Sequence, residues 1–201
     1  VPKCDLTKGN RVYVLNALTG EKLNSFDTAR GVVAEVFVVQ DATTGLAKYA
    51  YAADLGGNVY RISGADANTP FADTKPDAWT MTRIASLGCD DPSKSCAPNR
   101  KFMFVPDVLD DNGTYVLLLG SGDREKPLTI WENSNSVNNH FFMLRDNPTD
   151  KAWLTSENTT CGSDVICMQS LLAIGNTDPT PEELAEKPKD GIWVCEEPSR
   201  W

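Results

Sequence analysis

The sequence contains a single histidine, His140, among 201 residues. A Ser-His-Asp or Cys-His catalytic site needs a histidine that exchanges a proton with the nucleophile. His140 lies in the alternating aromatic run HFFMLRD, where a strand residue is expected. The charged trio Asp123, Arg124 and Glu125 follows an apolar run and is typical of a salt-bridged loop, and no phosphate-binding glycine loop is present. We therefore predict that the protein is not an enzyme.

Long apolar runs and excess positive charge are also lacking. No stretch approaches the roughly 20 apolar residues that a helix needs to cross a bilayer. The net charge is −9, from 19 basic and 28 acidic residues, which makes nucleic acid and anionic membranes poor partners. The sequence begins at Val1 without a methionine or a signal segment, so we expect a mature chain or part of a longer one.

Helical patterns are scarce. The clearest is TPEELAEK, in which Thr180 can cap, Pro181 takes the first helical position and Glu183 completes a capping box. Residues 164–175 fit either a helix or a buried strand, and the four-residue spacing within them favours the helix. Short helical insertions are therefore expected near the C-terminus only.

Most of the chain alternates with a period of two, which is typical of strands. RVYVLNALTGEKLNSF and KYAYAADLGGNVYRIS predict two hairpins. Further strands are expected in GVVAEVFVVQ, WTMTRIASL, KFMFVPDV, TYVLLLGSG and HFFMLRD, separated by turns rich in Asp, Asn, Gly and Pro. Many short strands of this kind predict an all-β fold. The separation of Tyr13 and Tyr60, within the two hairpins, fits the repeat of roughly 40–50 residues found in propeller blades.

The six cysteines predict disulfides. Two short spacings each enclose a loop rich in Asp, Ser, Pro or Gly, and the two remaining cysteines could join the ends of the chain. Zinc would need closer cysteine pairs or nearby histidines, and the sequence offers neither. Disulfides indicate an oxidising compartment such as the periplasm or the cell exterior. The short spacings suggest Cys89 with Cys96 and Cys161 with Cys167, and Cys4 could pair with Cys195.

The loop of the second hairpin is unusually rich in turn-forming residues. Gly56, Gly57 and Asn58 suit a backbone at positive φ, and Asp54 can accept hydrogen bonds from free N–H groups of the same turn. We predict a structural turn, and a ligand-binding loop is the alternative.

Clustered acidic residues are the candidates for a metal site, because calcium binds hard oxygen ligands. The best cluster precedes Gly113 and does not have EF-hand spacing. The other acidic loops are expected to be turns, and they contain Asp66, Asn68 and Asp73, and Asp146, Asn147 and Asp150. The candidate metal ligands, with calcium as the cofactor considered, are Asp107, Asp110, Asp111 and Asn112.

Several segments together resemble one family. YAYAADLGGNVYRI is similar to the Tyr-Ala-Gly-Asp-Leu-x-Gly-Asn-x-x-Arg hairpin of the PilC/PilY proteins found at the tips of type IV pili. YVLLLGSGDREKP and NNHFFMLRDNP resemble the next strands of that family, in the same order. The resemblance covers roughly residues 11–150, leaving a cysteine-containing segment over residues 151–201. It implies a modified seven-bladed β-propeller of quinoprotein-like blades, of which a single domain or fragment over residues 1–201 would be a part.

The resemblance also implies a function. Proteins of this family act in pilus assembly and in attachment to host or abiotic surfaces, with minor pilins or other tip proteins as partners. They reach the pilus tip on the cell exterior through the periplasm. The family's calcium loop corresponds to residues 41–49 here, but it lacks the expected carboxylates at Gly45 and Tyr49 and gains Lys48. We therefore expect that loop to have lost its calcium site.

Two alternative functions are compatible with the same strands. One is a subunit of an extracellular filament or surface complex, which would associate through exposed strand edges. The other is a fragment of a quinoprotein-like dehydrogenase, although we see no cluster of ligands for the quinone.

Overall fold

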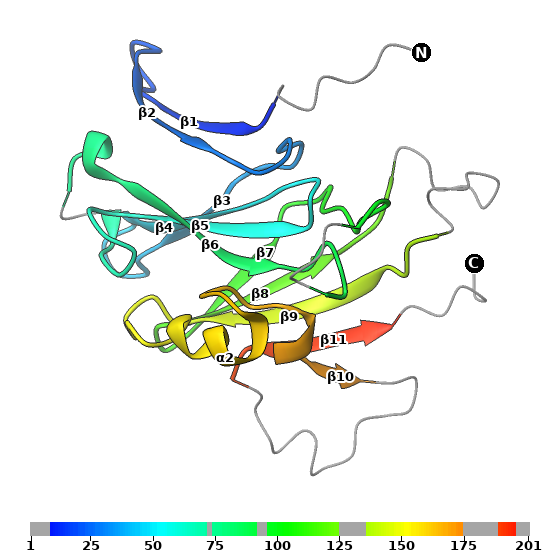
Figure 1. The fold of residues 1–201 in the computed structure, drawn as a ribbon. Helices are drawn as coiled ribbons and strands as arrows, with labels where there is room; N and C mark the ends of the chain where they lie inside the picture. Colours follow the sequence, from blue (N-terminus) through cyan, green and yellow to red (C-terminus); the bar gives the residue numbers. More distant parts are fainter. Residues whose placement is uncertain (1–8, 72–73, 92–95, 125–135, 175–188, 196–201) are drawn as a thin grey trace, which may run out of the picture.

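The computed structural model describes residues 9–71, 74–91, 96–124, 136–174 and 189–195, except for the side chain of Cys195. Three β-sheets lie one above another, and the short helical turns that follow β9 lie beside the third sheet (Figure 1). The predicted all-β class is therefore correct. Within the described ranges the sheets are open, and they do not close into a ring.

The first two sheets contain the predicted hairpins. β1 and β2 form a two-stranded sheet, and β3 to β6 form an antiparallel sheet in chain order. Their bounds are β1 (Arg11–Leu15), β2 (Lys22–Asp27), β3 (Phe37–Gln40), β4 (Ala47–Ala53), β5 (Asn58–Ser63) and β6 (Thr80–Ser86). A short 3-10 helix, η2 (Pro76–Ala78), precedes β6.

The third sheet has the order β10-β11-β9-β8-β7. All its pairs are antiparallel except β10 with β11, which are parallel. Its strands are β7 (Asp107–Asp111), β8 (Thr114–Gly120), β9 (His140–Asp146), β10 (Leu172–Ile174) and β11 (Gly191–Cys195).

Two strands begin later than the sequence predicts. In GVVAEVFVVQ only β3 at the C-terminal end is a strand. KFMFVPDV is not a strand before Pro106, because Phe102 is fully buried and donates its N–H to the carbonyl of Asp54, 3.2 Å away, outside any sheet. The strand that follows, β7, includes Asp110 and Asp111, two of the candidate metal ligands.

The prediction of a helix over residues 164–175 is wrong. The described part of this segment contains a 3-10 turn, η4 (Met168–Ser170), followed by the strand β10. Upstream lie η3 (Thr155–Glu157) and the single-turn helix α2 (Asn158–Cys161), which ends at Gly162 with φ of 70°. The second predicted helix, TPEELAEK, lies outside the described residues. No described helix has the length and apolar character needed to span a membrane.

The middle sheet is apolar on both faces. One face packs against the third sheet and forms the main core, whose fully buried side chains include Tyr51, Val59, Leu117 and Phe142. The other face packs against the β1–β2 hairpin in a smaller core. Burying each large apolar side chain stabilises the fold by about 1.5–3 kcal/mol. The sheets are therefore held together by layers of side chains. Figure 1 shows the stacked sheets from the side.

Gly57 lies where the β4–β5 turn touches the loop after β6. It has φ of 75°, and a Cβ there would lie 2.4 Å from the Cα of Gly88. The N–H of Leu87 donates to the carbonyl of Gly57 at 2.8 Å. The glycine is needed both for the left-handed backbone and for this close approach.

Replacing Gly57 by Ala should destabilise the protein more than replacing Gly20 by Ala. Both glycines have left-handed backbone, with φ of 75° and 72°, so both substitutions introduce about 1–2 kcal/mol of strain. Nothing lies within 4 Å of a Cβ at Gly20. Only G57A adds the overpacking term of about 1–3 kcal/mol. Urea unfolding of both variants measures the difference, and equal losses would contradict the close approach.

Candidate functional site

Asp54 organises the hairpin loop that the sequence singles out. Its side chain is fully buried and accepts bonds from the N–H groups of Arg30, Gly56 and Asn58 at 2.8–3.0 Å. The amide of Asn58 and the hydroxyl of Tyr60 donate to the same carboxylate. Its acceptor capacity is therefore used by the protein itself, so the predicted structural turn fits the geometry and a ligand-binding loop does not.

A second buried carboxylate joins the two large sheets. Asp146 on β9 is paired with Arg61 on β5 and accepts a hydrogen bond of 2.8 Å from the hydroxyl of Tyr51 on β4. Arg61 also donates to the carbonyl of Ala67 at 2.7 Å. All three side chains are buried.

Burial and charge shift the pKa values of this group. Burial raises the pKa of the Tyr51 hydroxyl well above its usual value, and the neighbouring carboxylate of Asp146 raises it further. For Arg61, burial lowers the pKa but the attraction of Asp146 outweighs it, so the net pKa is raised. Arg61 therefore stays charged and Tyr51 neutral, which suits a permanent structural link between the sheets.

This ion pair was not predicted from the sequence, although a signal for it existed. Arg61 and Asp146 each occupy a strand position on the same face as core residues, where charged side chains are rarely buried unless they are paired. Asp146 had been expected in a turn together with Asn147 and Asp150. In the structure, Asn147 and Asp150 do accept hydrogen bonds from their own turn, and Asp146 is the last residue of β9.

The candidate metal ligands are spread over both faces of β7 and its turn. Asp110 approaches Lys48 at 4.0 Å and accepts the N–H of Gly113, whereas Asp111 approaches Arg145 at 3.9 Å. Consecutive strand residues point to opposite faces, so these two carboxylates diverge. Across the described ranges, no three His, Cys, Asp or Glu side chains gather as a metal-binding group. Calcium at Asp107, Asp110, Asp111 and Asn112 stays a prediction that calorimetric titration of chelator-treated protein would test.

The other acidic loops form turns. Asp41 accepts bonds from the N–H groups of Thr43 and Thr44, and these bonds lower its pKa. Asp66 accepts bonds from Asn68 and Thr69 in the same way. Asp73 lies outside the described residues. The carboxylates that the structure describes in these loops therefore close local turns.

Two of the three predicted disulfides are present. Cys89 is bonded to Cys96 and Cys161 to Cys167, with Cα atoms 5.7 and 5.8 Å apart. Cys4 lies outside the described residues and the side chain of Cys195 is not described, so their pairing stays a prediction.

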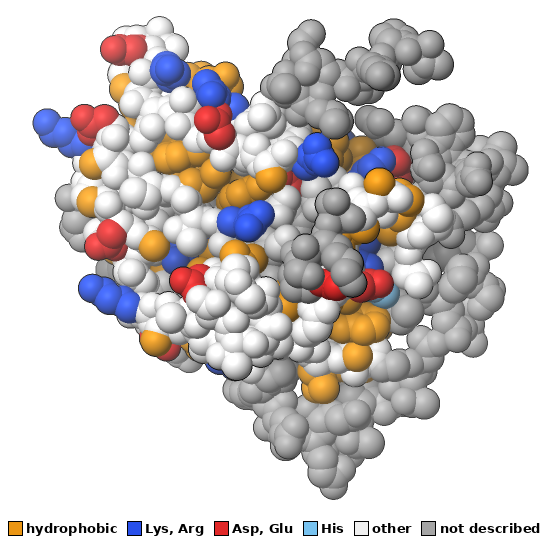
Figure 2. Space-filling view, in the orientation of Figure 1, with side chains coloured by type: hydrophobic (Ala, Val, Ile, Leu, Met, Phe, Trp, Pro, Cys, Tyr) orange, Lys and Arg blue, Asp and Glu red, His pale blue; other side chains and the backbone are white. Residues whose placement is uncertain are grey.

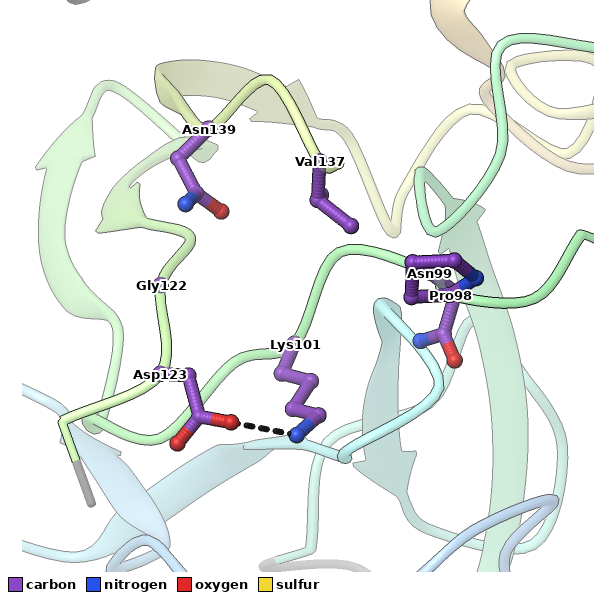
Figure 3. Close-up of a pocket in the computed structure, with 7 residues that line it drawn as sticks. All are labelled: Pro98, Asn99, Lys101, Gly122, Asp123, Val137 and Asn139. Carbon is purple, nitrogen blue, oxygen red and sulfur yellow. Dashed lines mark hydrogen bonds and ion pairs between the residues drawn. The ribbon is translucent and has the colours of Figure 1, made fainter. Parts of the chain in front are cut away.

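The charged trio after β8 is partly described. Asp123 is paired with Lys101 at 2.6 Å, and the guanidinium of Arg124 lies 5.0 Å from the ring centre of Phe104. Glu125 lies outside the described residues. Lys101 and Asp123 form one wall of a cavity of about 210 Å³ at the end of the third sheet (Figure 3).

His140 lies among aromatic side chains, as its strand position predicts. The centre of its ring lies 4.4 Å from the ring centre of Trp193 on β11 and 5.9 Å from that of Phe142. Its Nδ1 atom is buried and has no hydrogen-bond partner among the described residues. Burial lowers the pKa of His140, and nearby Arg100 lowers it further.

One face of the third sheet carries partly exposed apolar side chains, with Asp111 and Arg145 on the same face. The strand register places Leu109 beside Val116, and Met143 between Leu118 and Ile192. Leu109 is 55% exposed and Phe141, on the same face, 43%. Charged side chains of both signs are interspersed on the molecular face in Figure 2, which therefore has no single-sign patch. The open sheet face is thus a candidate interaction surface.

Comparison with known proteins identifies the fold. No family model and no curated protein matches the sequence. Among solved structures, the chain matches the C-terminal domain of PilY1 from Pseudomonas aeruginosa, with a TM-score of 0.56 and 14% sequence identity. The chain shares the fold of that PilY1 domain. The match covers 92% of this chain and 44% of the PilY1 chain, so this chain spans less than half of its length. The predicted resemblance to PilC/PilY proteins is confirmed at the level of the fold.

Removing the carboxylate of Asp146 should strongly destabilise this PilY1-like fold. Asp146→Asn leaves the buried charge of Arg61 without a counter-charge, and breaking a buried pair in this way costs about 3–5 kcal/mol. The control is Asp27→Asn, because Asp27 pairs with Arg11 at an exposed site where such pairs contribute little. Urea unfolding should show a large loss for D146N and almost none for D27N. Similar losses in the two variants would show that the buried pair is not a key link.

His140 should make the protein less stable in mild acid. Its folded-state pKa is lowered, so the unfolded state binds a proton more readily as pH falls. The stabilisation is present above the unfolded pKa of about 6.5 and is lost as pH drops through the folded value. Urea unfolding at pH 7.5 and at pH 5.5 should show this loss. His140→Phe keeps an aromatic ring and should reduce the pH dependence, and an unchanged dependence would exclude His140 as its source.

Proposed function

We propose that the chain is a non-enzymatic part of a propeller-type domain that acts in type IV pilus assembly and surface attachment. The observation that carries this proposal is the match to the PilY1 C-terminal domain over 92% of the chain. The two disulfides support passage through the periplasm to the cell surface or pilus tip. The proposed partners are minor pilins or other pilus-tip proteins, with a host or abiotic surface as the target.

The strand order supports the propeller interpretation. Propeller blades are four-stranded sheets arranged around a central channel. β3 to β6 follow chain order across the middle sheet, and the next sheet begins at its own edge strand, β7. β3 and β7 contact each other. The first strands of two successive sheets therefore meet, as the inner strands of neighbouring blades do.

The β1–β2 hairpin then corresponds to the outer half of a preceding blade. β2 leads into β3 as β6 leads into β7, so the hairpin occupies the position of the last two strands. It covers Ala50 and Ile62 of the middle sheet, whereas Val38 in the same cross-strand row is 47% exposed. The two inner strands of that preceding blade would cover Val38.

A neighbouring blade would also explain the open face of the third sheet. Both faces of the middle sheet are covered by neighbouring sheets, and the apolar residues around Leu109 and Phe141 would be covered by a following blade. The PilY1 domain is long enough to hold further blades beside the matched part. In this interpretation residues 1–150 contain the matched blades, and residues 151–195 extend the last one with β10 and β11.

The blade interpretation is tested by matched leucine substitutions in the native protein. Leu109→Glu places a charge on the open sheet face, whereas Leu18→Glu places it at a hairpin tip that is 97% exposed. If a further blade covers Leu109, L109E should lower the free energy of unfolding by several kcal/mol, because an unpaired charge would be buried. L18E should leave it unchanged. Equal, small effects in both variants would contradict coverage by a blade.

The pilus function is tested in the source cells. Deleting residues 9–195 from the chromosomal gene should reduce the number of surface pili and the number of attached cells. The L18E substitution serves as a control that leaves both numbers unchanged. Normal piliation and attachment after the deletion would overturn the proposal.

A subunit of an extracellular filament or surface complex is the second candidate. The open apolar face favours it, because copies of the chain could cover that face by stacking. Light scattering on the native protein separates the two proposals. A large assembly of chains of about 22 kDa would favour the filament subunit, and a long single chain would favour the pilus domain.

A further inference from the structure

The cavity at the end of the third sheet is separate from the buried carboxylates that hold the fold. Three chain segments form it: the loop before β7, the residues after β8 and the residues before β9 (Figure 3). Its volume of about 210 Å³ is smaller than that of pockets for drug-sized ligands, which begin at about 300 Å³. The described residues that line it are Pro98, Asn99, Lys101, Gly122, Asp123, Val137 and Asn139.

The polar groups of the cavity are held in place by the protein. Lys101 and Asp123 pair at 2.6 Å, with their side chains 38% and 16% exposed. The amide group of Asn139 points into the cavity, and its oxygen accepts a bond of 3.1 Å from the hydroxyl of Ser121. Asn99 is fixed on the opposite side by bonds to two main-chain carbonyls. Such pre-positioned groups reduce the entropy that a ligand loses on binding.

The chemistry of these groups limits the ligand class. Among the described residues that line the cavity, the charges of Lys101 and Asp123 are opposite and balance, so these residues favour neither an anion nor a cation. The pair nevertheless presents a donor next to an acceptor, which suits neighbouring hydroxyl groups that each donate and accept. Asn139 adds an amide, and Val137 and Pro98 supply apolar surface for C–H groups. A small ring that carries adjacent hydroxyls satisfies all these requirements.

We propose that this cavity binds a neutral saccharide unit. Its hydroxyls bond to Lys101, Asp123 and Asn139, and its C–H groups contact Val137 and Pro98. The inference deepens the proposed attachment role, on which it rests for its biological meaning, by naming the class of surface ligand. The open face around Leu109 is not involved, so the proposed contact with a further blade and ligand binding use different parts of the third sheet.

Saccharide binding can be measured directly on the native full-length protein. Calorimetry and ligand-observed NMR with a panel of neutral mono- and disaccharides should detect at least one ligand with millimolar or tighter affinity. Asp123→Asn and Asn139→Ala should each weaken that binding about tenfold. The first replaces an acceptor oxygen by an NH2 donor and removes the charge that holds Lys101 in place, and the second removes the amide group. The matched control Asp27→Asn alters another Asp–cation pair, far along the chain, and should leave affinity unchanged. Unfolding curves confirm that all variants remain folded.

Three outcomes would overturn the inference. They are no binding by any neutral saccharide, binding that D123N and N139A leave unchanged, and a preference for acidic over neutral saccharides. The deletion of residues 9–195 tests the pilus proposal independently of saccharide binding. Saccharide binding together with normal piliation after the deletion would support the cavity assignment and overturn the pilus role. Loss of piliation without any saccharide binding would support the pilus role and overturn the cavity assignment.

Discussion

The buried pair between Arg61 and Asp146 is the interaction on which the arrangement of the two large sheets depends. Both groups lie in the main core, where an unpaired charge would be strongly unfavourable. Apolar packing alone would tolerate small shifts between the sheets, because it is not directional. The ion pair and the Tyr51 hydroxyl are directional, and they therefore fix which residue of β5 faces which residue of β9.

Asp54 has the corresponding role at the end of the hairpin. Its carboxylate gathers donors from the turn and from residue 30, while Gly57 allows the loop after β6 to approach. The family-like hairpin motif is therefore explained by folding requirements. The cavity around Asp123 and the open face around Leu109 both lie outside this hairpin.

Local patterns predicted much of the fold, because alternation and turn residues act over short distances. Both hairpins, β6, β8 and β9 were predicted at nearly their observed positions, as were the disulfides of Cys89 and Cys161. The late start of β7 was not predicted, since it depends on Phe102 packing against a turn distant in sequence. The cavity was missed for the same reason, because its three segments meet only after the sheets form. Charged residues at core-facing strand positions were the one overlooked signal for the link between sheets.

The chain order of the middle sheet also affects how the structure can assemble. Each strand from β4 to β6 pairs with the strand made just before it, so all pairings within this sheet are local in sequence. Asp146, by contrast, lies 85 residues beyond Arg61. Until β9 is in place, the guanidinium of Arg61 has no buried counter-charge and is best left in water. The middle sheet therefore cannot exclude water from the face that carries Arg61 on its own. Because β9 is synthesised after β3 to β6, that face loses its water only when the third sheet packs against it.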